Sequence, residues 1–295
     1  MSADAVPFRP GPTGRRLLTE AGPIAYWAPD GDPRSPAVLL LHGAACGAWV
    51  WAEGFAAALA AAGCRVAAPD LPNGPGATLA DRLSAVRAAM AAIGGPVVLV
   101  GHSLGALLAQ RLAGESAVVA QVLLAPVPPE GLWASNLALL WGDPLLWREV
   151  ARLQEGPGSA DPVLAARLFG PRMPRAAARS VLARLGGESR AAILEAQAPQ
   201  PVLPGWAAAC PATVIAGAAD RLIPPDAAWR CALWHGTVPE ILPATGHLLM
   251  LEPGWETVAA HILPVVGGIA QAADGPPRHR AGRGEDEAWT STSQR

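Results

Sequence analysis

The sequence predicts an α/β fold: a mostly parallel central sheet with helices on both faces and a helical cap insertion on the loop side of the sheet. Three observations lead to this prediction. Short apolar runs alternate with helix-like segments along most of the 295 residues. Several of these runs end in Gly, Pro or Asp, as strands do where the chain turns toward a helix. The block 127–208 contains no strand-like run, although it lies between two strands of the predicted sheet.

The expected elements follow one another along the chain. Apolar residues spaced three and four apart from Leu79 to Ile93 predict an amphipathic helix that Gly94-Gly95 ends. An Ala-rich helix is expected at 55–62, with Gly63 just after its end. The expected strands lie at 17–19, 24–27, 37–41, 65–68, 97–100, 118–124, 213–216 and 240–242, and a closing helix lies at 255–265.

One core domain is predicted from two stretches of the chain, 17–126 and 209–268, with the helical cap of 127–208 between them. A flexible, Pro/Gly-rich N-terminus at 1–16 precedes the core. Residues 269–295 are polar, charged and rich in Gly and Pro, so a disordered tail is expected there.

The composition excludes several function classes. The formal net charge of −2 offers no global electrostatic attraction to nucleic acid. All 22 basic residues are Arg, so the chain has neither a Schiff-base lysine nor a P-loop lysine. The cysteines lack metal-type spacing, and a chain with so large an apolar core is not expected to need a disulfide framework. They are Cys46, Cys64, Cys210 and Cys231, and Cys46, near the expected active-site loop, is interpreted as a small buried hydrophobe.

Neither a signal peptide nor a membrane span is predicted. The first residues lack the apolar stretch of about 7–15 residues that a signal peptide needs, and no uncharged apolar run reaches about 18 residues. We therefore expect a cytoplasmic protein.

The stretch VVLVGHSLGALLAQRLA, residues 97–113, carries the strongest functional signal. It predicts a buried strand, a sharp turn at Ser103 and a helix, in the pattern G-x-S-x-G. Such a turn strains the serine backbone, requires small residues two positions away on each side, and presents the hydroxyl above the sheet edge. The positive end of the following helix suits a developing oxyanion.

A serine nucleophile needs a base and an acid that orients the base. Asp220 follows the apolar strand at 213–216, and His247 follows the short strand at 240–242. In a parallel sheet, the loops that carry all three residues open at the carboxyl edge of the strands. Asp226 is the second candidate for the acid. The other histidines considered are His102, whose side chain is expected to diverge from that of Ser103, and His235, His261 and His279 in helical or tail segments.

Backbone N–H groups are the candidate oxyanion donors. His42-Gly43 follows the strand at 37–41, and the N–H groups of Ala44 and Leu104 are expected to form the oxyanion hole. His42 itself is expected to brace its loop by hydrogen bonds.

Together these segments resemble the α/β-hydrolase fold family. The resemblance is carried by HG at 42–43, APDLPNGPG at 68–76, GHSLG at 101–105, GAADRLIPP at 217–225 and GHLLMLEP at 246–253. It covers about 35–126 and 208–266, and implies a serine hydrolase core with a variable helical cap. The segment PNGPGAT is shorter than its family counterpart and lacks a polar substrate-loop motif, so it indicates no subfamily.

The main hypothesis is hydrolysis of a small-molecule carboxylic ester or thioester through an acyl-enzyme, with no metal or organic cofactor. Acyl transfer and cofactor-free perhydrolase (haloperoxidase-like) chemistry use the same triad and remain alternatives. A non-catalytic ligand-binding module on this fold is another. Dehalogenases and epoxide hydrolases of this fold place an aspartate where Ser103 stands, which argues against both.

The cap supplies candidate substrate contacts. Trp133, Leu137 and Trp141 are expected to line an apolar acyl channel, with Leu139, Leu140 and Trp147 as further candidates. The alternative is that most of these side chains only bury the cap against the core. Six arginines accompany a single acid, Glu188, and form either a solvated basic surface or a docking site for an anionic acyl carrier; among them, 172, 175 and 179 have the spacing of one helix face. They are Arg167, Arg172, Arg175, Arg179, Arg184 and Arg190.

Overall fold

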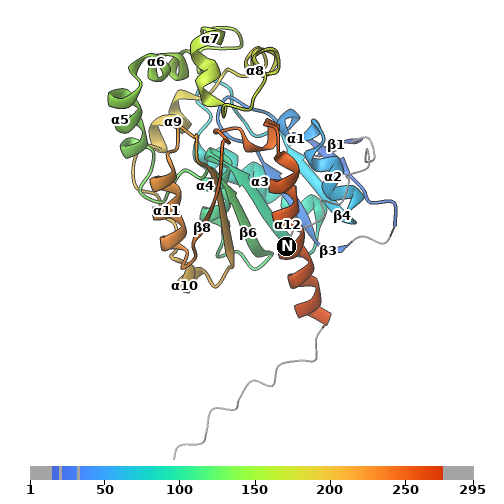
Figure 1. Ribbon diagram of the computed structural model, residues 1–295. Coiled ribbons are helices and arrows are strands. Elements are labelled where there is room, and N and C mark those ends of the chain that lie inside the picture. Colours follow the sequence, from blue (N-terminus) through green and yellow to red (C-terminus); the bar gives the residue numbers. More distant parts are fainter. Residues whose placement is uncertain (1–14, 20–21, 32–33, 275–295) are drawn as a thin grey trace, which may run out of the picture.

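An eight-stranded sheet forms the centre of the part of the chain that the computed structural model describes, residues 15–19, 22–31 and 34–274 (Figure 1). The strand order is β1-β2-β4-β3-β5-β6-β7-β8. The pairs β1–β2 and β2–β4 are antiparallel, and all other neighbours are parallel. The strands are β1 (Arg15–Thr19), β2 (Gly22–Trp27), β3 (Arg34–Leu41), β4 (Cys64–Pro69), β5 (Val97–His102), β6 (Val118–Leu124), β7 (Ala212–Gly217) and β8 (Pro239–Leu242).

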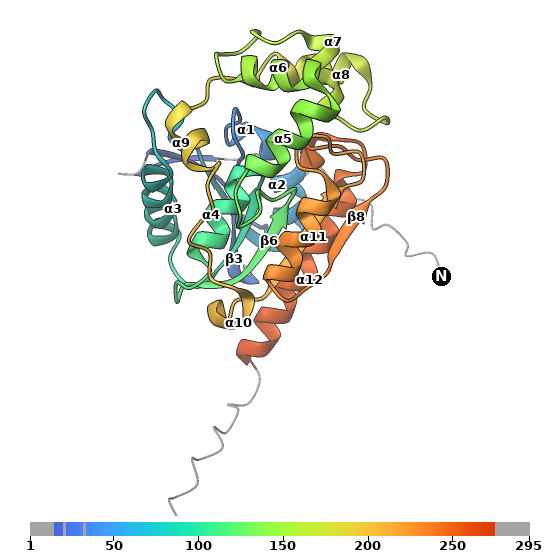
Figure 2. The same ribbon diagram turned by 90° about the vertical axis from the view of Figure 1, so that its left-hand side faces the viewer.

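Helices cover both faces of this sheet (Figures 1 and 2). One face carries α1 (Trp49–Ala52), α2 (Phe55–Ala61) and α12 (Trp255–Asp274). The opposite face carries α3 (Leu79–Ile93), α4 (Leu104–Leu112) and α11 (Pro225–Trp234). The short helix α1 has no counterpart in the sequence prediction.

Each central strand is buried on both sides, which explains its unbroken apolar sequence. In β3, Val38 and Leu40 belong to the hydrophobic cluster under α2 and α12, whereas Leu39 and Leu41 belong to the cluster under α3 and α4. This split follows from the two-residue period of a strand, which sends successive side chains to opposite faces.

Helix α3 begins and ends where the sequence predicts. Thr78 caps it, because its side chain accepts a hydrogen bond from Asp81 N–H while the Asp81 carboxylate accepts one from Thr78 N–H. Gly94 follows the last turn with φ +68°, a left-handed angle that favours glycine.

The chain between β6 and β7 is helical, and its helices α5 to α8 lie across one end of the sheet (Figures 1 and 2). Several buried cap leucines, including Leu139, Leu146 and Leu153, belong to the same hydrophobic cluster as β3 and α12. Cap and core therefore share one apolar interior. The elements of this segment are α5 (Trp133–Gly142), α6 (Pro144–Leu153), α7 (Pro162–Ala165), a 3-10 turn (Ala166–Leu168), α8 (Arg175–Leu182), α9 (Arg190–Glu195) and α10 (Gly205–Ala208).

Two predicted boundaries need correction. Strand β1 begins at Arg15, inside the stretch expected to be flexible. Helix α12 runs past Pro264 to Asp274, because Val266 and Ile269 still pack against the core, so the expected tail boundary at 269 falls within a helix. The remaining predicted tail and N-terminus, 275–295 and 1–14, lie outside the described residues.

Among the helices that are described, none combines the length and apolarity that crossing a bilayer requires.

Candidate active site

Ser103 stands on the sharp turn between β5 and α4 and has a left-handed backbone, with φ +52° and ψ −114°. Two glycines make this turn possible. A Cβ on Gly105 would lie 2.2 Å from the carbonyl oxygen of Leu41, and one on Gly101 would lie 2.4 Å from the carbonyl oxygen of Gly105. Only hydrogen fits at either position, so the spacing G-x-S-x-G is a steric requirement of this turn.

Hydrogen bonds of its backbone N–H and C=O groups hold the strained Ser103 in place. Ser103 N–H donates to Leu124 O at 2.9 Å, and Ser103 O accepts from Val127 N–H at 3.3 Å. These bonds tie the turn to the end of the neighbouring strand β6. The residue is only 7% exposed and lines the cavity described below.

His247 and Asp220 are joined by a hydrogen bond of 2.8 Å from Nδ1 of the imidazole to Oδ2 of the carboxylate. The second oxygen of Asp220 accepts from the N–H groups of Leu222 and Ile223, each at 2.9 Å. Since an ionised carboxylate only accepts, Nδ1 carries the hydrogen and Nε2 is left as the basic nitrogen. His247 and Ser103 line the same cavity.

The loop that carries His247 is anchored to the cap. His247 N–H donates to Leu168 O at 2.8 Å. The buried Glu252 carboxylate accepts from Gly246 N–H at 2.9 Å and from Gly170 N–H at 2.8 Å, so one oxygen joins the two loops. Burial raises the pKa of Glu252, although both N–H groups favour its ionised form.

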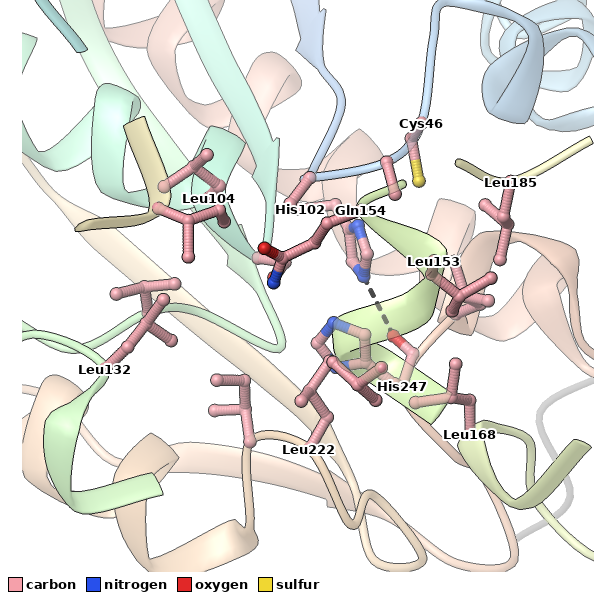
Figure 3. Close-up of a pocket in the computed structure, with 18 of the residues that line it drawn as sticks. Cys46, His102, Leu104, Leu132, Leu153, Gln154, Leu168, Leu185, Leu222 and His247 are labelled. Atoms are coloured by element: carbon pink, nitrogen blue, oxygen red, sulfur yellow. Dashed lines mark hydrogen bonds between the residues drawn. The ribbon is translucent and has the colours of Figure 1, made fainter. Parts of the chain in front are cut away.

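The side chain of His102, which we expected to diverge from that of Ser103, lies beside His247. It lines the cavity, and its ring centroid lies 4.8 Å from that of His247. Its Nε2 donates to the carbonyl oxygen of His247 at 2.9 Å, the bond drawn in Figure 3. Burial, followed by the neighbouring His247, lowers the pKa of His102 well below its usual value. The neutral ring therefore fixes the backbone of His247, a role that sequence adjacency alone does not reveal.

Ala44 and Leu104, the predicted oxyanion donors, both line the cavity. Leu104 is the first residue of α4, where an N–H has no partner within the helix. The peptide that carries Ala44 N–H is held at its other end, because His42 Nδ1 donates to Gly43 O at 2.9 Å. His42 Nε2 accepts from Leu71 N–H at 2.9 Å. Burial lowers the pKa of His42 to about 4, which keeps it neutral and able to make both bonds.

The cavity between core and cap has a volume of about 100 Å³. Leucine side chains from both parts of the chain surround it (Figure 3). Asn136 and Gln154 are the polar cap residues in its wall. The apolar residues are Val127, Leu132, Val150, Leu153, Leu168, Leu185, Ile193, Leu222, Ile223 and Leu248, together with Ala44, Ala45, Cys46 and Leu104.

The structure does not place the predicted acyl-channel residues at this cavity. Trp133, Leu137 and Trp141 are 54%, 47% and 81% exposed and lie on the outer face of α5. Leu132 and Asn136, at the start and in the first turns of the same helix, line the cavity instead. The error arises because α5 has apolar residues on both faces, so its sequence does not show which side is buried.

The rival residues are engaged elsewhere. Asp226 forms an ion pair of 2.5 Å with Arg230 on the surface of α11. His235 is hydrogen-bonded to Gln110 at 3.1 Å, and His261 donates to Thr257 O within α12. His279 lies outside the described residues.

The cap arginines do not form the single basic face that their spacing indicated. Helix α8 begins only at Arg175, after Pro174, so Arg172 is not on it. Arg172 donates to Thr245 Oγ1 at 3.3 Å. Arg167 pairs with Asp143 at 2.7 Å, and Arg184 pairs with Glu53 and covers the ring of Trp49 at 3.9 Å.

Cys46 lines the cavity but is no candidate nucleophile. It is buried within the hydrophobic core, as the sequence predicts. Burial, with the nearby Glu188 carboxylate, raises the pKa of its thiol to about 12, so the reactive thiolate is not populated.

Comparisons with known proteins identify the family and the fold. Residues 38–261 match the model of the alpha/beta hydrolase family. The chain is similar to a thermophilic esterase from Thermogutta terrifontis, with 23% identity, a TM-score of 0.63, and coverage of 87% of this chain and 99% of that one. It is similar to carboxylesterase CesB from Bacillus subtilis, with 19% identity, a TM-score of 0.62, and coverage of 86% and 91%.

At such identities these likenesses concern the fold. No curated protein matches the chain. Because the family match spans most of the chain, and the sheet, the turn at Ser103 and the Asp-His pair stand in the order that the sequence predicts, this protein belongs to the α/β-hydrolase family.

Proposed function

We propose that this protein is a serine hydrolase that cleaves carboxylic esters. The observation that carries the proposal is the 2.8 Å hydrogen bond from His247 to Asp220, made by an imidazole that lines the same cavity as the strained Ser103. This arrangement supplies a nucleophile, a base and a group that orients the base.

The proposed reaction uses each of these groups. His247 Nε2 takes the proton of Ser103 as Oγ attacks the ester carbonyl, and the carbonyl π electrons move onto its oxygen. The N–H groups of Ala44 and Leu104 stabilise this oxyanion. The C–O bond then breaks, and His247 gives the proton to the leaving alcohol. Water then attacks the acyl carbon while His247 takes its proton. The bond between the acyl carbon and Ser103 Oγ breaks, His247 returns the proton to Oγ, and the acid is released.

The cavity wall favours an uncharged acyl group. Its lining is mostly leucine, valine and isoleucine, with Asn136 and Gln154 as polar partners for an ester or alcohol oxygen. Three of the six cap arginines are already bound within the protein. A small-molecule ester or thioester therefore suits this site better than a large anionic acyl carrier.

The test compares wild type with Ser103→Ala on p-nitrophenyl esters of increasing acyl length. We expect the variant to lose at least about 10³-fold in kcat, because the nucleophile is absent. A fluorophosphonate should label wild type and fail to label the variant, as judged by the intact mass. Full ester turnover by Ser103→Ala would falsify the mechanism.

Further experiments distinguish ester hydrolysis from acyl transfer, perhydrolysis and non-catalytic binding. Addition of an acceptor alcohol or of hydrogen peroxide should leave the free acid as the main product of wild type. A dominant new ester or peracid would instead assign acyl transfer or perhydrolysis. A wild type that binds ester analogues but is neither labelled nor active would point to a non-catalytic binding module.

A further inference from the structure

The cap forms two hydrogen bonds with Ala45, the residue that follows the candidate oxyanion donor Ala44. Ala45 N–H donates to Oε2 of Glu188 at 2.8 Å, and Ala45 O accepts from Gly186 N–H at 2.9 Å. Ala45 has φ +56°, an angle that a non-glycine residue adopts only under constraint. Both polar groups of this backbone unit are therefore held by the cap segment 186–188.

Glu188 is itself held from the core. Its Oε1 accepts from Arg82, on helix α3, and from Ser189 N–H at 2.7 Å. Both side chains are buried, Arg82 completely. Arg82 Nε and Nη1 have no hydrogen-bond partner among the described residues, so Glu188 is the anion that compensates this guanidinium. The carboxylate thus joins α3, the cap and the loop of Ala44 and Ala45.

The contribution of the Arg82–Glu188 ion pair to folding stability does not explain why it is buried here. A buried ion pair recovers little more than the cost of removing both charges from water. The pair does, however, fix the carboxylate within hydrogen-bond reach of Ala45 N–H. Its effect falls on the loop that presents Ala44 N–H to the cavity.

We propose that Glu188, oriented by Arg82, is a positioning residue for the oxyanion hole: its hydrogen bond to Ala45 N–H holds the preceding Ala44 N–H in the direction that the reaction requires. This inference rests on the proposed ester hydrolysis. It makes the cap a part of the catalytic apparatus as well as a wall of the cavity.

Two double variants isolate the hydrogen bond from the charges. Arg82→Met with Glu188→Gln removes the ion pair but keeps an amide oxygen that can accept from Ala45 N–H. Arg82→Met with Glu188→Leu removes the ion pair and the acceptor, with a side chain of similar size. We expect the leucine double variant to have a kcat about 10- to 100-fold below that of the glutamine double variant, with KM unchanged, since loss of a whole oxyanion donor costs about 10²- to 10³-fold.

A second readout separates positioning from folding. A trifluoromethyl ketone, which forms an oxyanion adduct with the serine, should bind the leucine double variant more weakly than the glutamine double variant by the same factor. The ester's alcohol product should inhibit both equally. Arg87 lies on the same helix as Arg82 and pairs with Glu115 at the surface. Arg87→Met, which breaks only this exposed pair, is the matched control and should keep wild-type kcat.

The outcomes are distinguishable. Equal kcat and equal ketone affinity in two folded double variants overturn the positioning role. If the leucine variant does not fold, Arg82→Met with Glu188→Ala decides, because it also removes both the ion pair and the acceptor: a kcat equal to that of the glutamine double variant overturns the proposal, and a lower kcat at unchanged KM supports it. A wild type without turnover or fluorophosphonate labelling rejects the proposed function instead.

Discussion

Ser103 shows how little freedom the chain has at the proposed nucleophile. Its φ of +52° is tolerated because the turn is fixed from both sides, by Ser103 N–H on Leu124 O and by the close approach of Gly105 to Leu41. Strain of this kind costs about 1–3 kcal/mol and persists only where the surroundings over-determine it. The hydroxyl is therefore placed by packing before any substrate arrives.

The first prediction concerns this packing. Gly105→Ala should destabilise the protein by at least about 3 kcal/mol, since the added Cβ overlaps a backbone oxygen that cannot move without shifting β3. Gly142→Ala, at the end of α5, meets no atom within 4 Å and should change stability by less than about 1 kcal/mol, in the stabilising direction. Urea unfolding midpoints measure both, and similar midpoints for the two variants would contradict the steric argument.

His42 acts on a single peptide unit. Its two hydrogen bonds, to Gly43 O and from Leu71 N–H, link the oxyanion loop to the loop after β4. Bracing of this loop is what the sequence predicts for His42, and both bonds confirm it. The reason is chemical: a neutral imidazole has one donor and one acceptor, which match one carbonyl and one N–H.

Helix α5 is the element on which sequence and structure differ most. Its ten residues, WASNLALLWG, contain no charge and carry apolar side chains all round. Periodicity cannot choose the buried face of such a helix. The structure buries Ser135 and Leu139 and leaves both tryptophans of the helix outside.

The second prediction tests that assignment. Trp141→Ala should leave kcat/KM for all esters within about twofold of wild type, because its side chain is 81% exposed and does not line the cavity. Leu132→Trp places a larger side chain in the cavity wall and leaves less space for the acyl group. It should lower kcat/KM for long acyl esters by at least about tenfold, while short esters are less affected. Assays over a series of acyl lengths measure both. A larger loss of kcat/KM in Trp141→Ala than in Leu132→Trp would instead place the acyl channel at the outer face of α5.

Across the whole molecule, charged and polar groups connect the cap to three of the loops that form the proposed site. Glu188 holds the loop of Ala45, Glu252 joins Gly170 to the loop of His247, and Asp143 pairs with Arg221, the residue after Asp220. The apolar interior is also continuous between cap and core. The docking of the cap and the geometry of the proposed site are therefore linked.

The third prediction follows from the charge of Asp143. Burial opposes its ionisation, but the Leu146 N–H and the guanidinium groups of Arg221 and Arg167 outweigh burial and lower its pKa. The folded protein thus binds fewer protons here than the unfolded chain does. The resulting stabilisation is present above the ordinary carboxyl pKa and is lost as the pH falls through the lowered value.

Asp143→Asn keeps the N-cap of α6 and removes the charge. We expect it to lower Tm by about 2–4 °C near neutral pH, and the difference from wild type to shrink as the pH falls below about 4. Differential scanning calorimetry across this pH range measures the effect. Asp226→Asn, on the exposed pair with Arg230, is the control and should differ little from wild type at any pH. A Tm difference for Asp143→Asn that does not change with pH would contradict the ionic origin.

The order of strands and helices, the nucleophile turn and the candidates Ser103, Asp220 and His247 could be predicted from the sequence alone. Each depends on a local pattern: apolar runs for buried strands, the helical period of 79–93, and glycines at both sides of Ser103. Such patterns record how one element is buried, and neighbouring residues are enough to read them.

Only the tertiary structure decided which face of α5 meets the cavity, that His102 packs on His247, and that Glu188 reaches Ala45. The last two contacts join residues 145 and 143 positions apart. Their existence depends on how cap and core are placed relative to each other, and that placement is set by the shared apolar interior rather than by the residues beside each group.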